Sequence, residues 1–451
     1  MRSVVVLAAL LGAVSAAPSS SFFRNDKVGF TFAHAGGVSD IAITKDNTLN
    51  GTYPYHEPKT LNMFVASAAA ARPMPLEFIN NFNGGQVKAY IQGLDSKGKI
   101  VFIKSDGTLF YPIPSESNIP VEIDNSKIAI SLPGRGQKFN IDLPIPIYSG
   151  RVYFSEGKLG FYMVKDEHGA GLVQPSVTNP ADPSSETNWG FVEFTYSPDG
   201  AIFANISYVD YIGMILSMSL SNKDSSYVQL TKGLDSGAVS SICKDLVSQS
   251  GKDGRNWKAM CVTDKAGKPI RVLSPNVYAV MKADDFEDYW QEYVDQVWQQ
   301  YSSRPLTIDT QGPAGKVKCR VNGSQMDCDG DNRSHLKPSA KDIWSCDSGP
   351  FGKKEGDNDV HLAVIPRLCA AFVRSTLLLQ GGDVQPSLPE ADYYKVNTTN
   401  HYSRLVHEHE VDGQGYAFAF DDVNPDGENA SGAVASRNPD ILRVSFGAPL
   451  S

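Results

Sequence analysis

The stretch NWGFVEFTYSPDGAIFANISYVDYIG, residues 188–213, predicts two β-strands joined by a turn at residues 197–200. Aromatic and β-branched residues are frequent in both segments, and a Pro-Asp-Gly turn separates them. Each segment nevertheless carries one acid, Glu193 and Asp210, although acidic residues are depleted in strands. The two carboxylates therefore need either a structural or a functional reason.

Strand-like segments also recur before this stretch. They include VKAYI at 87–91, IVFIK at 100–104 and GRVYFSEGKLGFYMV at 150–164, with joints rich in Gly and Asp. Short strands at this spacing predict a β-sandwich or β-barrel lobe, which we place at residues 74–226. The remainder, residues 227–451, mixes helical and strand patterns and predicts an α/β lobe.

The N-terminus has the pattern of a secretory signal. One Arg precedes an apolar run and a small-residue site, so residues 1–16 are expected to be removed. The run is too short to span a bilayer, and we expect a soluble, secreted protein without a membrane partner. Residues 17–73 form an N-terminal extension with little regular pattern. It could be an added strand or a prosegment.

Six cysteines lie in the second half of the chain, which fits disulfide bonding in an exported protein. All 15 pairings are open, and we expect neighbours in sequence to pair: 243 with 261, 319 with 328, and 346 with 369. Glycosylation sequons occur at Asn50, Asn205, Asn322, Asn332, Asn397 and Asn429.

The second lobe contains three predicted helices, at residues 236–250 with Ser236 as its cap, at 284–301, and at 363–378 with a break at Pro366. Residues 415–425 and 441–447 are predicted strands. The helix at 284–301 has apolar residues at helical spacing, which indicate core packing, with a sugar-binding platform as the alternative. The stripe consists of Phe286, Trp290, Tyr293, Val297 and Tyr301.

Several other functions are disfavoured. A formal net charge of −9 argues against nucleic acid as a partner. On a strand, His407 and His409 would share a face and could bind a metal, but a solvated segment is the simpler interpretation. The alternating acids of DCDGDN at 327–332 resemble a calcium loop but lack its glycine and glutamate positions, so a turn is favoured. We expect no metal and no cofactor.

The two acids could perform glycoside hydrolysis, which needs one carboxylic acid and one carboxylate. Alternation places Glu193 and Thr195 on one strand face, and Asp210 shares a face with Tyr208. The alternative is that both acids are solvent-face charges. A tight hairpin would pair Glu193 near residue 204 or 205 and leave Asp210 roughly 17–20 Å away. For the acids to meet, either the chain must curl after Tyr208 or the turn must be longer than residues 197–200.

Longer motifs resemble glycoside hydrolase family 64, the β-1,3-glucanases with a thaumatin-like fold. The resemblance covers about residues 75–449, and its motifs follow one another in the family's order. They are PLEFINNF at 75–82, SGRVYFS at 149–155, WGFVEFTY at 189–196, NISYVDYIG at 205–213, CDSGPF at 346–351, NHYSRLVHEH at 400–409 and GYAFAFDDV at 415–423.

This resemblance implies a mainly β protein, with a β-barrel or sandwich lobe and a mixed α/β lobe flanking a wide groove. It implies an inverting endo-glucanase in which Glu193 is the general acid and Asp210 the general base. Thr195 and Ser207 would contact the sugar. Asp421 and Asp422 would also line the groove, with a structural role as the alternative.

The implied partner is a linear β-1,3-glucan, and the implied product a five-sugar oligosaccharide released by a monomeric enzyme. A glycan on Asn205 would crowd the groove. A non-catalytic thaumatin-like β-glucan-binding protein is the alternative function.

Overall fold

The computed structural model describes residues 72–113, 119–166, 169–177, 179, 182–428 and 430–450. The predicted signal peptide and nearly all of the extension at 17–73 lie outside these residues, as do the sequons at Asn50 and Asn429.

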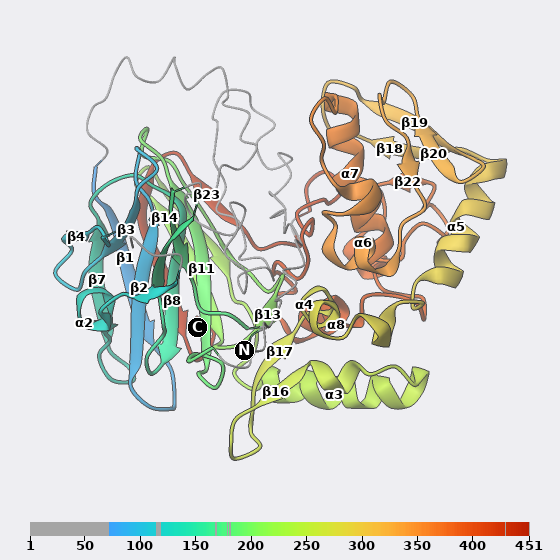
Figure 1. The fold of residues 1–451 in the computed structure, drawn as a ribbon. Coiled ribbons are helices and arrows are strands. Elements are labelled where there is room, and N and C mark those ends of the chain that lie inside the picture. Colours follow the sequence, from blue (N-terminus) through green and yellow to red (C-terminus); the bar gives the residue numbers. More distant parts are fainter. Residues whose placement is uncertain are drawn as a thin grey trace, which may run out of the picture.

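The N-terminal half is built on an eight-stranded antiparallel sheet (Figure 1). Its strand order is β23-β12-β11-β8-β2-β3-β4, and β6 pairs with β2 beside β3. The strands are β2 (Val87–Leu94), β3 (Ile100–Ile103), β4 (Leu109–Phe110), β6 (Ile130–Ser131), β8 (Ile147–Glu156), β11 (Trp189–Tyr196), β12 (Ile202–Ile206) and β23 (Val434–Ser436).

A second sheet of five strands, in the order β15-β14-β24-β1-β7, packs against the first. Its strands are β1 (Met74–Asn80), β7 (Lys138–Leu143), β14 (Leu216–Asn222), β15 (Ser225–Thr231) and β24 (Pro439–Phe446). The predicted lobe boundary at residue 226 falls inside β15. The predicted strand at 441–447 is confirmed as β24, which returns from the C-terminus to pair in parallel with β1.

Aromatic side chains join the two sheets. The ring of Phe154 lies 5.1 Å from those of Phe78 in β1 and Phe446 in β24. Between β8 and β11, Gly150 is required, because a Cβ there would lie 2.5 Å from the ring of Phe194. Each fully buried aromatic side chain of this kind stabilises the fold by about 1.5–3 kcal/mol. The sandwich predicted from strand spacing is thereby observed.

Two smaller sheets flank the sandwich, with strand orders β10-β9-β5 and β13-β17-β16. Their strands are β5 (Val121–Glu122), β9 (Tyr162–Asp166), β10 (Gly169–Val173), β13 (Tyr211–Ile212), β16 (Cys261–Thr263) and β17 (Pro269–Leu273), and a short helix α2 (Asn125–Ile128) precedes β6. Through β13, the chain that leaves β12 pairs with residues of the helical half.

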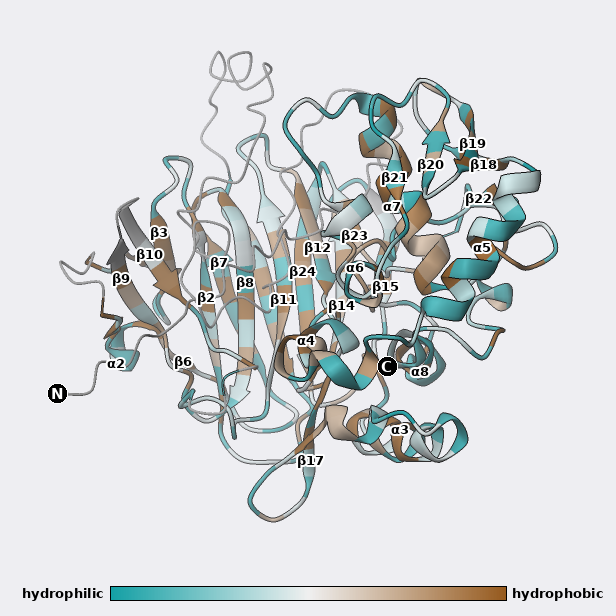
Figure 2. Cartoon of the chain, turned by 45° about the vertical axis from the view of Figure 1, so that its right-hand side comes forward, coloured by the Kyte–Doolittle hydropathy of each residue, from teal (hydrophilic) through white to brown (hydrophobic). Residues whose placement is uncertain are grey.

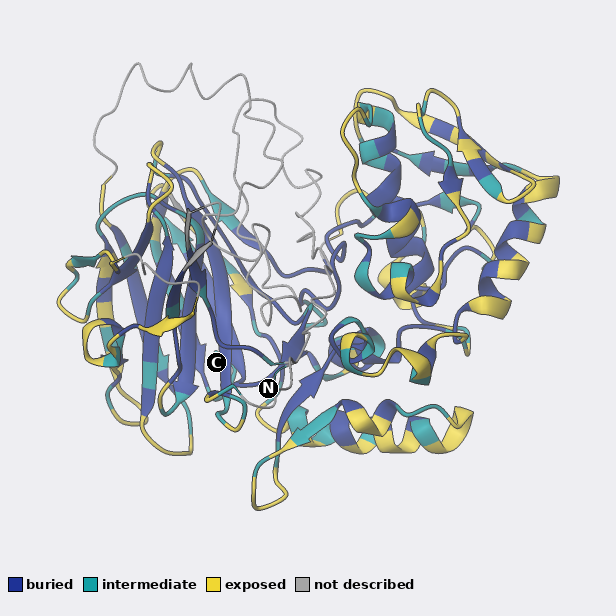
Figure 3. Cartoon of the chain, viewed as in Figure 1, coloured by how far each residue is buried: buried dark blue, intermediate teal, exposed yellow. Residues whose placement is uncertain are grey.

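The other half contains helices around a five-stranded sheet of order β21-β20-β19-β18-β22. Its elements are α3 (Ala238–Asp253), η3 (Trp257–Met260), α4 (Pro275–Met281), η4 (Ala283–Phe286), α5 (Gln291–Ser303), β18 (Leu306–Asp309), β19 (Lys316–Asn322), β20 (Gln325–Cys328), β21 (His335–Leu336), α6 (Ala340–Ser345), η5 (Gly349–Phe351), α7 (Asp359–Val373), β22 (Val384–Gln385), η6 (Glu390–Asp392) and α8 (His401–His409). Polar residues lie on the outer surfaces of α3 and α5 (Figure 2), and residues on these surfaces are exposed (Figure 3).

Two details of the predicted helices are wrong. The helix at 236–250 forms as α3, but its N-cap is Gly237 without a side-chain hydrogen bond, and Ser236 lies in the turn before it. The helix at 284–301 is divided into the 3-10 turn η4 and the helix α5. The aromatic stripe is nevertheless buried throughout, which confirms core packing over a sugar platform.

Pro366 does not interrupt its helix. It lies inside α7, which begins after the Asn358 cap and continues to Val373. A proline in a helix interior costs about 3 kcal/mol or more. Nearly every residue from Val364 to the end of α7 is buried, so tertiary packing offsets that loss. The hydrophobic periodicity of one segment does not reveal how much its burial against other elements stabilises it.

Residues 415–425 are not the predicted strand. Tyr416 makes an isolated bridge to Ser207, and the following residues form turns. Asp421 accepts hydrogen bonds from the amide of Ala417 and from Arg374, and these contacts favour a turn over an extended strand. This segment, residues 416–424, is called the acidic loop below.

All three predicted disulfides are present: Cys243–Cys261, Cys319–Cys328 and Cys346–Cys369. The strands β19 and β20 form a hairpin, which places Cys319 directly opposite Cys328.

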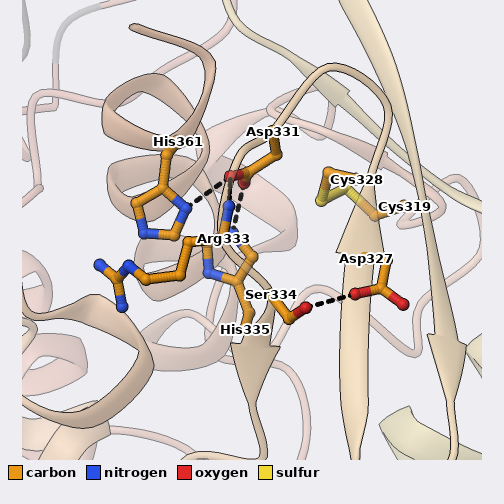
Figure 4. Close-up of a disulfide and its surroundings, with 8 residues drawn as sticks. All are labelled: Cys319, Asp327, Cys328, Asp331, Arg333, Ser334, His335 and His361. Atoms are coloured by element: carbon orange, nitrogen blue, oxygen red, sulfur yellow. Dashed lines mark hydrogen bonds and ion pairs between the residues drawn. A yellow bond between two sulfur atoms is a disulfide. The ribbon is translucent and has the colours of Figure 1, made fainter. Parts of the chain in front are cut away.

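The DCDGDN segment forms a turn beside this disulfide (Figure 4). Asp331 accepts hydrogen bonds of 2.9 Å from His335 and 2.7 Å from His361, and both imidazoles are buried. Ligand atoms of Cys328, Asp331 and His335 lie within 4.8 Å of one another, but the sulfur of Cys328 is already bonded to Cys319. The segment therefore has a structural role.

Among the helices of the described residues, none combines the length and apolarity needed to cross a bilayer.

Candidate active site

Glu193 lies at the centre of the eight-stranded sheet. In β11 it is opposite Arg151 of β8 on one side and Asn205 of β12 on the other. The register with Asn205 confirms the predicted hairpin. Glu193 is only 2% exposed, so it is not the solvent-face charge that the alternative interpretation required. Alternation points it away from Phe194, which packs on Gly150 in the sandwich core.

Arg151 neutralises Glu193 directly. Its Nε lies 3.2 Å from Oε1 of the carboxylate, and both side chains are buried. The Nη1 of Arg151 donates to Oε1 of Gln174 at 2.7 Å and lies 3.2 Å from the hydroxyl of Tyr153. The hydroxyl of Tyr153 also hydrogen-bonds to Gln174. A buried ion pair needs such additional hydrogen bonds to be tolerated.

Asp210 lies in a bend, because the chain leaves the sheet soon after β12. Strand pairing ends with the bridge from Ser207 to Tyr416, and pairing resumes at Tyr211 in β13. The curl expected after Tyr208 is therefore present. Asp210 is 6% exposed, and its backbone carbonyl accepts a 2.9 Å hydrogen bond from Ser274.

Tyr211 connects the surroundings of the two acids. Burial raises the pKa of its hydroxyl well above the usual value, and the charges of both Asp210 and Arg151 act on it. Because Arg151 is also in contact with Glu193, Tyr211 lies near Asp210 and near the cationic partner of Glu193. The ring of Tyr211 also packs 4.8 Å from Trp189, so the wall next to Glu193 is aromatic.

Polar side chains around Glu193 have buried atoms that are not satisfied by the protein. Among the described residues, Oγ1 of Thr195, Oδ1 of Asn205 and Oγ of Ser207 lack a hydrogen-bond partner. Such atoms are costly to bury unless another group bonds to them. Asn205 is only 3% exposed within the sheet, so its sequon is inaccessible in the folded protein.

Asp421 has a structural environment. One carboxylate oxygen accepts a 2.9 Å bond from Arg374, and the other accepts from His407 at 2.9 Å and from the amide of Ala417 at 2.8 Å. Burial raises the pKa of Asp421, but the charges of His407 and Arg374 outweigh it and leave the pKa lowered. These contacts favour the structural alternative for Asp421, which anchors the acidic loop to α7 and α8.

Asp422 has a different environment. Its Oδ1 accepts a 3.0 Å hydrogen bond from Tyr416. Burial raises the pKa of Asp422 to about 7, because it outweighs the hydrogen bond from Tyr416 and the charge of Arg367, which both lower the pKa. The charge of Glu193 also acts on Tyr416. Tyr416 therefore lies between Asp422 and the surroundings of Glu193.

The two histidines of VHEHEVD lie on helix α8 and not on a strand. They therefore diverge. His407 contacts Asp421 and Glu410, whereas His409 is 2.8 Å from Asp245 on α3. The shared face that a strand would give them does not form, and the favoured solvated segment is instead a helix with both histidines in ion pairs.

Sequence reasoning missed Arg151, Gln174 and Tyr416. Arg151 lies in the motif SGRVYFS, but its contact with Glu193 depends on the register between two strands. Gln174 follows β10 in a segment without a recognisable pattern. An arginine inside an otherwise apolar strand was the one available sign.

Comparisons with known proteins identify the family of the chain. The family model for glycoside hydrolase family 64, described as β-1,3-glucanase, matches residues 72–446. The chain belongs to glycoside hydrolase family 64. This result confirms the resemblance inferred from the motifs, and the matched range of the family 64 chain includes Glu193, Asp210 and the acidic loop.

Two curated relatives of this family 64 chain are glucan endo-1,3-beta-glucosidases, from Cellulosimicrobium cellulans and from Arthrobacter sp. (strain YCWD3). Each is 29% identical over 369 residues, which cover 80% of this chain. The match spans 63% of the length of these relatives.

Solved structures of the family share the fold. A laminaripentaose-producing β-1,3-glucanase in complex with laminaritetraose matches with a TM-score of 0.72 and 27% identity, over 83% of this chain and 98% of that one. A β-1,3-glucanase domain from Clostridium beijerinckii matches with a TM-score of 0.63 and 20% identity over the same shares, and supports the fold alone. The predicted mainly β architecture with an α/β part is confirmed.

Proposed function

We propose that this chain is a secreted endo-β-1,3-glucanase that cleaves linear β-1,3-glucan with inversion at the anomeric carbon. The family match over residues 72–446 is the observation that carries the proposal. The relatives named glucan endo-1,3-beta-glucosidase and the family structure with bound laminaritetraose support the substrate class.

In the proposed mechanism, Glu193 protonates the glycosidic oxygen and Asp210 activates the attacking water. An inverting enzyme needs one protonated and one ionised carboxyl group, with space for water beside the second. The burial of both acids supports this assignment, and so does Tyr211, on which the charges of Asp210 and of the Glu193 partner Arg151 both act. Thr195 and Ser207 would bind sugar hydroxyls, because their buried oxygens lack partners within the described part of the protein.

Asp422 is proposed as a further contact to the glucan in the wide groove between the lobes. The proposed product is a five-sugar oligosaccharide. One lobe is the thaumatin-like sandwich predicted at residues 74–226, which β15, β23 and β24 also join. The other is the mixed lobe formed by the rest of residues 227–451. The protein would act as a monomer without a cofactor. The signal peptide at 1–16 would direct its export.

The test is incubation of the purified protein with linear β-1,3-glucan. Product size is followed by chromatography and the first-formed anomer by NMR. We expect α-anomeric oligosaccharides, because inversion of a β-linkage gives the α-anomer. Glu193→Gln and Asp210→Asn should each lower turnover by a factor of about 10³ or more, whereas Asp329→Asn, an exposed control, should not.

Retention on insoluble glucan without release of reducing sugar would instead indicate a glucan-binding protein. Full activity of both active-site variants would remove Glu193 and Asp210 from the mechanism.

A further inference from the structure

Arg151 forms the direct cationic contact of Glu193, and this contact has a consequence for proton transfer. The ion pair has an Nε–Oε1 distance of 3.2 Å, and the two side chains are 7% and 2% exposed. A neighbouring guanidinium at this distance favours the ionised form of a carboxyl group. Screening by water and salt is weak at such burial.

The guanidinium is held in place independently of Glu193. Gln174 and Tyr153 bind its Nη1, and its central carbon lies 5.1 Å from the ring centre of Phe191. Gln92 donates a further 3.2 Å hydrogen bond to the same oxygen of Gln174. Gln174, Tyr153 and Phe191 therefore hold the guanidinium of Arg151 even without Glu193. The planar guanidinium has little freedom to rotate away from the carboxylate.

We propose that Arg151 is a positioning residue that orients the Glu193 carboxyl group and sets the upper pH limit at which this group can donate a proton. The inference rests on the proposed function of Glu193 as the acid. The chemistry is a single proton transfer, from the carboxylic acid of Glu193 to the glycosidic oxygen as the glycosidic bond breaks. Arg151 itself neither gains nor loses a proton.

Other titratable and charged groups surround this pair from several elements. They are Tyr153 on β8, Asp210 in the bend, Tyr211 on β13, Arg271 on β17, and Tyr416 on the acidic loop. Burial raises the pKa of Tyr211 and of Tyr416 well above the usual value, so both phenols are neutral at working pH. Arg271 is directed to the carbonyls of Ser185 and Thr187. Arg151 is the cation in contact with Glu193, so its replacement should change the titration of Glu193 most.

The experiment measures kcat/KM on linear β-1,3-glucan against pH for the wild type, Arg151→Met, Arg151→Gln and Arg151→Lys. Loss of the cation should move the alkaline limb upward by about 1–3 pH units in the first two variants. Arg151→Lys keeps the positive charge, so the alkaline limb of its pH profile should stay near that of the wild type. Its kcat should fall, because lysine does not orient the Glu193 carboxyl group as arginine does. Arg135→Met, at the surface, is the control.

A uniform loss of activity with an unmoved alkaline limb in Arg151→Met and Arg151→Gln would overturn the proposal and leave Arg151 a purely structural residue. Circular dichroism and thermal unfolding identify a variant that fails to fold. If one of the two neutral variants is unfolded, the other carries the comparison.

A second measurement separates this proposal from the proposed function. Glutamate labelled with ¹³C at the carboxyl carbon allows NMR titration, and the resonance of Glu193 is the one absent from Glu193→Gln. Without Arg151, this resonance should titrate at a higher pH, whether or not the protein cleaves glucan. Absence of glucan cleavage by the wild type would reject the proposed function alone, whereas an unchanged titration midpoint would reject the role of Arg151.

Discussion

The hydroxyl of Tyr416 lies 3.0 Å from Oδ1 of Asp422, and both side chains are buried where the acidic loop meets the eight-stranded sheet. Tyr416 also bridges to Ser207, on the segment that leads to Asp210. The acidic loop is thus tied to the candidate active site through one tyrosine. Its own acids differ in pKa, because cations lower the pKa of Asp421 whereas burial raises that of Asp422.

Asp422→Asn should stabilise the protein above neutral pH. Burial raises the pKa of Asp422 from 3.8 to about 7, so ionising it in the folded state costs free energy. Each pKa unit corresponds to about 1.4 kcal/mol, which gives a gain of about 1–4 kcal/mol.

The gain should be absent below about pH 4, grow between pH 4 and 7, and remain constant above, as measured by urea unfolding. Asp329→Asn, which replaces an exposed acid, should show no such trend. A pH-independent difference for Asp422→Asn would contradict the prediction.

His407→Gln should destabilise the fold by about 3–5 kcal/mol, because it breaks a buried charge network. Burial lowers the pKa of His407, but Asp421 and Glu410 outweigh burial and raise the pKa well above 6.5. The stabilisation is therefore complete below about pH 6.5 and decreases as the pH rises through the elevated pKa of the folded state.

Chemical unfolding from pH 6 upward measures this difference. The matched control is His409→Gln, whose ion pair with Asp245 is partly exposed and should contribute at most about 1 kcal/mol. Equal decreases in the free energy of unfolding for the two variants would show that the buried network stabilises the fold no more than the partly exposed ion pair does.

Thr195→Val should weaken substrate binding without destabilising the protein. Valine keeps the shape of threonine but removes a hydroxyl whose oxygen has no partner among the described residues. One net hydrogen bond is worth about 1 kcal/mol, so KM should rise about fivefold while the melting temperature stays or increases. Thr263→Val, at an exposed position, is the control. A lower melting temperature with unchanged KM would assign Thr195 a structural role.

Removal of the Cys346–Cys369 disulfide should cost more than removal of Cys319–Cys328. The bonds close segments with sequence separations of 23 and 9 residues. Loop-closure entropy then gives about 3.4 and about 2.6 kcal/mol, respectively. Paired Cys→Ala variants and denaturant unfolding measure both values. The reverse order would show that local packing outweighs the entropy of the unfolded chain.

Local patterns were sufficient for several features of the fold. Strand alternation around Glu193 and the short turn after Tyr196 placed Glu193 opposite Asn205, as observed. Sequence proximity also predicted the disulfides. These features depend on residues close in the chain, where turn geometry and spacing limit the possibilities.

Features that depend on distant partners were not predictable. Residues 415–425 have the composition of a strand, yet contacts of Asp421 with Arg374, 47 positions away, bend them into a loop. Pro366 remains in a helix because burial on surrounding elements offsets its local cost. In both cases tertiary packing outweighs local propensity.

The amino-acid sequence alone determined the family, the strand that carries Glu193 and the bend that carries Asp210, because motif order and side-chain alternation are local properties. Only the tertiary structure decided that Arg151, 42 residues from Glu193, neutralises it, and that cations lower the pKa of Asp421 whereas burial raises that of Asp422. The physical reason is that the charge state of a buried carboxyl group depends on neighbours that strand register and packing bring to it, and these neighbours come from distant parts of the chain.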